Sequence, residues 1–115
     1  LNIEDFKTNH IGIDIGPNTV SLFSKILLSS KNIFWNGPMG IFEIDNFSKG
    51  TKEITEIIAK ASAYTCIGGG DSVSAINKFS HTQYFNHIST GGGASLEYLE
   101  GKKLPGVNIY NSLII

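Results

Sequence analysis

Two glycine triplets constrain this chain more than any other feature. Gly68-Gly69-Gly70 and Gly91-Gly92-Gly93 each follow a short apolar run and precede a stretch with a helical pattern. A glycine-rich turn that opens a helix presents several backbone N–H groups at the positive end of the helix dipole, where anions bind. The triplets therefore indicate two anion sites in one small domain. For each of them, a tight strand-to-helix turn without a ligand is the alternative.

The composition excludes several classes of protein. The 115 residues have room for one domain, and 17% charged with 41% hydrophobic residues is typical of a globular chain. A net charge of −1 with scattered lysines argues against a nucleic-acid partner. No apolar run approaches the ~20 residues that span a membrane, and the N-terminus has no signal-peptide pattern. The single cysteine, Cys66, fits a reducing compartment, so we expect a cytoplasmic protein without a membrane partner.

The basic residues indicate a piece of a longer protein. The chain begins at Leu1, and all nine of its basic residues are lysines. An enzyme that handles phosphate places Arg, Lys or a metal at the transferring group, but neither glycine turn contains a lysine. We therefore expect much of the countercharge to come from a part outside this chain.

The spacing of apolar residues predicts alternating strands and helices. Strands are expected at 10–15, 33–36, 64–67 and 87–89. Helices are expected from Asn18, from Thr51, from Asp71 or Ser72 to about Phe79, and from about Gly92 to Glu100. This order is typical of an α/β fold with a Rossmann-like parallel sheet flanked by helices. Because such a sheet must be covered on both faces, we expect further strands from outside the chain.

Parallel sheets bind ligands beyond the carboxyl ends of their strands. Four segments are predicted to lie there, namely 16–17, 36–43, 68–72 and 89–95. Within them, Asp71 is either a helix cap or a ligand of Mg²⁺ beside a nucleotide phosphate. Glu43 is either a solvated carboxylate or a partner of ribose hydroxyls. Asn36 and Pro38 either contact a ligand or only form the turn.

Five motifs occur together in one order along the chain. They are Asp14-Ile15-Gly16-Pro17, residues 35–43 (Trp-Asn-Gly-Pro-Met-Gly-Ile-Phe-Glu), Gly68-Gly69-Gly70-Asp71-Ser72, residues 87–97 (His-Ile-Ser-Thr-Gly-Gly-Gly-Ala-Ser-Leu-Glu) and residues 99–107. In this combination, from about residue 11 to 107, the chain resembles the C-terminal portion of phosphoglycerate kinase. The resemblance implies two Rossmann-like lobes. Residues 1–103 would be part of the C-terminal nucleotide-binding lobe, and 104–115 a tail that returns to the N-terminal lobe.

The resemblance also implies an activity. Members of the family transfer a phosphoryl group between 1,3-bisphosphoglycerate and ADP in glycolysis, with Mg²⁺, giving 3-phosphoglycerate and ATP. The parent protein would be a cytoplasmic monomer whose phosphoglycerate substrate binds the N-terminal lobe. Since that lobe is not in this chain, we expect the isolated chain to be inactive.

The resemblance assigns roles to residues of the glycine turns and the segment between them. Asn36 and Pro38 resemble residues of the nucleotide pocket, and Glu43 the carboxylate that binds the ribose. The nucleotide phosphates would be held at Gly68, Gly69, Gly70, Asp71 and Ser72, with Asp71 on Mg²⁺. The helix N-terminus that steadies the transferring phosphoryl group would be Gly91, Gly92 and Gly93.

Two other functions stay open from the residues alone. One is a nucleotide-binding module without catalysis. The other is a dinucleotide-binding oxidoreductase domain, against which the absence of G-x-G-x-x-G argues, because Val73 occupies the last glycine position.

Overall fold

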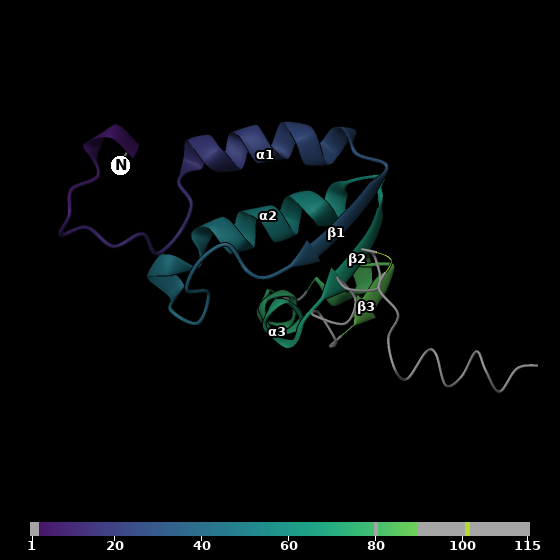
Figure 1. Ribbon diagram of the computed structural model, residues 1–115. Coiled ribbons are helices and arrows are strands. Elements are labelled where there is room, and N and C mark those ends of the chain that lie inside the picture. Colours follow the sequence, from purple (N-terminus) through teal and green to yellow (C-terminus); the bar gives the residue numbers. More distant parts are fainter. Residues whose placement is uncertain (1–2, 80, 90–100, 102–115) are drawn as a thin grey trace, which may run out of the picture.

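The computed structural model describes residues 3–79, 81–89 and 101 (Figure 1). One parallel sheet contains β1 (Asn32–Asn36), β2 (Tyr64–Gly68) and β3 (His87–Ser89), in the order β1-β2-β3. The helices are α1 (Pro17–Ser29), α2 (Lys49–Lys60) and α3 (Gly70–Lys78), with short 3-10 turns η1 (Ile3–Asp5), η2 (Asp45–Phe47) and η3 (Thr82–Tyr84). The predicted α/β fold, a parallel sheet flanked by helices, is confirmed.

The helices form one layer on the sheet. Helix α2 packs between α1 and α3 (Figure 1), and right-handed crossovers put α2 and α3 on the same face of the sheet. Within the described residues this cover lies on one face, and the strands follow it. Ile33 and Trp35 of β1 are buried, whereas Phe34 between them is half-buried. In β2, Cys66 is likewise half-buried, and burial raises the pKa of its thiol.

The core lies between the sheet and the helices. Its buried members are Val20, Ile33, Trp35, Ile54, Ile58, Ala63, Ile67, Ile76 and Phe85. Ile54 and Ile58 are four residues apart on α2 and so share the face that packs on the sheet. This is the kind of apolar spacing from which a helix after Thr51 was expected. None of the helices in the described residues is long and apolar enough to cross a membrane.

The predicted strand at 10–15 is wrong. These residues have no regular structure, and Ile11 is 83% exposed. Alternating isoleucines favour a strand only where a neighbouring strand supplies a ladder of hydrogen bonds. Here the Ile13 carbonyl accepts one backbone hydrogen bond, from Ile41 N at 3.1 Å. Of the four expected strands, three are therefore present in the described part, and the expected helix from Gly92 to Glu100 lies outside it.

The open edge of the sheet borders an apolar groove. Among the described residues β1 has a strand partner on one side only, which is β2. Beside it lies a groove of about 360 Å³ between α1, β1 and α2. It is lined by Phe23, Ile26, Leu27, Ile33, Phe34, Trp35, Met39, Ile54 and Ile58. Ile26 is 58% exposed there, so α1 leaves much of its apolar surface uncovered by the described residues. The expectation of further strands stays a prediction.

A distant carboxylate caps α2. The helix begins two residues before the predicted start at Thr51, and the hydroxyl of the N-cap residue Ser48 donates to Asp45 O instead of capping. Asp14 takes over this role, because its Oδ2 accepts a hydrogen bond from Gly50 N at 2.9 Å. A Cβ on Gly50 would collide with the Asp14 carboxylate, so the approach requires glycine there.

We expect Asp14→Ala to lower the free energy of unfolding by about 1 kcal/mol, as the loss of a helix cap does. Urea unfolding followed by circular dichroism measures the change. Asp5→Ala is the matched control, because Asp5 is exposed and lies outside this contact. Equal stability of the two variants would show that Asp14 is not a cap.

Candidate functional site

The candidate site lies at the carboxyl edge of the sheet. Asn36 pairs with Gly68, and Gly68 pairs with Ser89. The last residues of all three strands therefore lie in one row, and the turns after β1 and β2 leave the sheet side by side. Gly69 N extends the row by donating to Ser89 O at 2.9 Å. The predicted common rim is confirmed for these segments. Gly91, Gly92 and Gly93 lie outside the described residues.

The first glycine triplet turns β2 into α3. Gly69 is the N-cap and has φ +92°, a region that residues with side chains rarely adopt. The first intrahelical hydrogen bond runs from Val73 N to Gly69 O. The N–H groups of Gly70, Asp71 and Ser72 thus precede the helical ladder, at the positive end of the dipole. This is the geometry in which a helix start binds phosphate.

Asp71 does not cap this helix. The structure places Asp71 in the first turn of α3 with an exposed side chain, and no side chain of the described part caps the helix. The prediction that Asp71 or Ser72 is the cap is therefore wrong, because Gly69 turns the chain earlier and the helix begins at Gly70. Asp71 is available to a ligand in solvent, while the described residues contain no cluster of three or more metal-binding side chains. Mg²⁺ commonly binds one or two carboxylates together with substrate phosphates and water, and a single Asp71 fits that mode.

Ser72 joins the two turns of the rim. Its side chain is 1% exposed, and its Oγ accepts a hydrogen bond from Gly37 N at 2.6 Å. The carbonyl of Gly37 accepts another from Trp35 Nε1, also at 2.6 Å. Gly37 itself has φ +110°. The turn after β1 is thus fixed on both sides by side chains, a role for Ser72 that the sequence analysis missed.

The rest of the turn after β1 is held by α2. Met39 N donates to Oγ1 of Thr51, which is fully buried, at 3.1 Å. Pro38 is half-buried, and Asn36 is exposed at the end of its strand. Asn36 therefore faces solvent beside the glycine turn, where a ligand at the rim can reach it.

Glu43 lies in the loop between this turn and α2. Its side chain is exposed, and it has no hydrogen bond to any other described residue. The loop is fastened to α3 by Lys78, whose Nζ donates to Phe42 O at 2.7 Å and lies 3.0 Å from Asp45 Oδ1. Sequence analysis did not single out Lys78, since no local pattern links a helix end to a loop 33 residues or more away.

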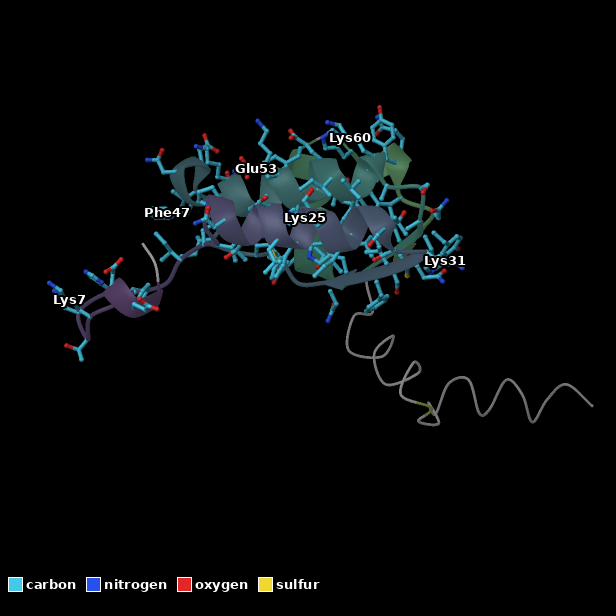
Figure 2. The ribbon with its side chains drawn as sticks, turned by 90° about the horizontal axis from the view of Figure 1, so that it is seen from above. Lys7, Lys25, Lys31, Phe47, Glu53 and Lys60 are labelled. Carbon is cyan, nitrogen blue, oxygen red and sulfur yellow. The ribbon has the colours of Figure 1, made fainter. Side chains whose placement is uncertain are left out.

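The lysines labelled in Figure 2 are spread over the described part rather than gathered in one cluster. In Figure 2, Lys7 lies at one end of the described part and Lys31 at the other. Lys31 comes directly before β1, and Lys60 ends α2, so both belong to the sheet edge opposite the rim. The segments 36–43 and 68–72 contain no lysine, so the positive charge that balances an anion bound at 68–72 would come from other segments.

We expect Ser72→Ala to destabilise the protein by about 1–2 kcal/mol, since it leaves the Gly37 N–H buried without its acceptor. Ser74→Ala is the matched control, because Ser74 is exposed on the same helix. Chemical denaturation of both variants measures the difference. If Ser72→Ala is as stable as Ser74→Ala, the bond to Gly37 does not hold the turns together.

Comparison with known proteins assigns the family. A model of the phosphoglycerate kinase family matches residues 1–102. The phosphoglycerate kinase of Borreliella afzelii is 54% identical over 109 residues, which are 95% of this chain and 27% of that protein. That of Finegoldia magna is 54% identical over 108 residues, or 94% of this chain and 27% of the relative.

Solved structures agree with the sequence comparison. The structure of phosphoglycerate kinase from Coxiella burnetii has a TM-score of 0.87 and 44% identity, covering 95% of this chain and 28% of that one. The chain spans about a quarter of the length of the relatives it matches. This chain belongs to the phosphoglycerate kinase family.

Proposed function

We propose that this chain is the nucleotide-holding part of a phosphoglycerate kinase. The complete protein would transfer a phosphoryl group between 1,3-bisphosphoglycerate and ADP, giving 3-phosphoglycerate and ATP. The observation that carries the proposal is the rim, where the turn after β1 and the glycine-rich start of α3 are joined by the bond between Gly37 N and Ser72 Oγ. Residues 1–103 would be part of the nucleotide lobe and 104–115 its tail. The cytoplasmic location and the monomeric state stay predictions.

The nucleotide phosphates would bind at the start of α3. Gly68, Gly69 and Gly70 allow the phosphates to approach the backbone closely, because no Cβ intervenes. The N–H groups of Gly70, Asp71 and Ser72 would donate to phosphate oxygens. Ser72 would contribute its backbone, while its hydroxyl oxygen holds the neighbouring turn.

Asp71 would hold Mg²⁺ beside the phosphates. Its carboxylate is exposed in the first turn of α3, next to the N–H groups that would bind the anion. When bound, Mg²⁺ neutralises charge on the phosphate oxygens. A carboxylate close to bound phosphates is unfavourable unless a cation lies between them, which supports a metal role for this side chain.

The nucleoside would lie toward the turn after β1. Asn36 and Pro38 would form its pocket, and Glu43 would accept hydrogen bonds from the ribose hydroxyls. The exposure of Asn36 and Glu43 supports this assignment. Gly91, Gly92 and Gly93 are proposed, on the family resemblance, to steady the transferring phosphoryl group with their backbone N–H groups.

We expect Asp71→Asn in the complete protein to weaken binding of Mg-ADP about tenfold or more and binding of metal-free ADP far less, because the lost charge acts through the metal. Calorimetric titration with and without Mg²⁺ measures both affinities. Asp5→Asn, an exposed aspartate in η1, is the control. An equal loss for the two ligands would make Asp71 a structural residue only.

We expect the 115-residue chain alone to form no ATP from 1,3-bisphosphoglycerate and ADP. Positioning two substrates against each other accounts for most of the catalysis of phosphoryl transfer, and this chain would supply one side of the site. A coupled assay for ATP tests this, with the complete protein as the positive control. Turnover by the chain alone would contradict the division of the site.

A further inference from the structure

We propose that Lys78 is a positioning residue that holds Glu43 in place for the sugar of the nucleotide. The inference rests on the proposed function, which assigns Glu43 to the ribose. It adds a residue outside the predicted site, at the far end of the helix whose start would bind the phosphates.

Two contacts fix the Lys78 ammonium group. Nζ donates to Phe42 O at 2.7 Å and pairs with Asp45 Oδ1 at 3.0 Å. The Asp45 side chain is 92% exposed, so solvent screens the ion pair and its contribution is small. The bond to the Phe42 carbonyl is partly buried and charge-assisted, and is therefore the stronger of the two.

This carbonyl belongs to the peptide bond that joins Phe42 to Glu43. Lys78 therefore fixes the peptide plane from which the Glu43 side chain departs. On the other side of that bond, the Phe42 side chain is buried, with 6% exposure. The peptide is held by apolar burial and by the ammonium group together, and this sets the position of the Glu43 backbone N from which the residue continues.

The other hydrogen bonds of the loop are mostly local. Phe42 N donates to Gly40 O, Ile44 N to Ile41 O, and Phe47 N to Ile44 O. These turns shape the loop but do not fasten it to the helix layer. Lys78 does so across 36 residues of sequence.

Helix α3 then sets both ends of the nucleotide site. It carries Asp71 in its first turn and Lys78 as its last residue, roughly 10 Å apart along the axis. A rigid helix of this length would hold the phosphate end and the ribose end of the site at a constant separation. Loss of the Lys78 contact would free the ribose end while leaving the phosphate end in place.

The test compares two nucleotides on the complete protein. We expect Lys78→Met to lower the affinity for Mg-ADP about five- to tenfold, as the loss of one hydrogen bond would. Mg-2′,3′-dideoxy-ADP lacks the ribose hydroxyls, and the same substitution should lower the affinity for it less than about twofold. In turnover, KM for the nucleotide should rise while kcat changes little. A general loss of structure would lower the affinities for both nucleotides by the same factor.

Matched variants isolate the contact. Lys25→Met removes an exposed lysine of α1, labelled in Figure 2, and should leave both affinities unchanged. Asp45→Asn removes only the ion pair and should have little effect. Lys78→Arg keeps a charged donor and should restore part of the preference for ADP. If Lys78→Met does not fold, Lys78→Gln is measured in the same way.

The outcomes separate the inference from the proposed function. If the unaltered complete protein does not bind Mg-ADP, the proposed function fails and the inference fails with it. If it binds Mg-ADP but Lys78→Met changes the affinities for both nucleotides equally, or changes neither affinity, the inference alone is overturned. A loss confined to the nucleotide that carries ribose hydroxyls supports it.

Discussion

The in-register pairing of three short parallel strands is the constraint on which the site depends. Asn36, Gly68 and Ser89 end their strands in one row, so the segments that follow leave the sheet together. Two hydrogen bonds continue this alignment beyond the strands, from Gly69 N to Ser89 O and from Gly37 N to Ser72 Oγ. A shift of one residue in the register would separate the turns and reverse the faces of the strand side chains.

Most of the rim is built by side chains that support backbone rather than by side chains that reach a ligand. Ser72 and Trp35 hold the two peptide groups on either side of the Gly37 Cα, and Thr51 holds the next part of the same turn. These side chains are buried and their hydrogen bonds are partly buried, so the bonds are shielded from much of the water and favour one geometry. Exposed groups such as Asn36 and Asp71 are then presented on a fixed frame, as a phosphate-binding site requires.

The helix layer is less complete at α1. Helix α1 buries Val20 but leaves Ile26 and Leu22 more than half exposed, beside the open edge of β1. This surface is apolar and grooved, which accords with a chain that spans about a quarter of its relatives. Within the described part, the Asp14 carboxylate at the start of α2 fastens the segment before α1 to the helix layer.

The sequence by itself determined the elements that depend on local pattern. The spacing of apolar residues predicted the helix after Thr51, the glycine turn predicted the start of a helix, and the alternation of elements predicted a common rim. Each of these depends on residues within one or two turns of one another, so neighbouring chemistry is sufficient. The isoleucines at 11, 13 and 15 misled because a strand also needs a partner, which the local pattern does not contain.

Only the tertiary structure decided which groups hold the site together. The partners Gly37 and Ser72 are 35 residues apart, and Asp14–Gly50 and Phe42–Lys78 are each 36 apart. Such bonds form because packing brings helix ends and loops together, and no periodicity along the chain records that distance. The same packing decided that Ser72 faces inward and Asp71 outward, although the two are neighbours in the sequence and the helix was expected to begin at either of them.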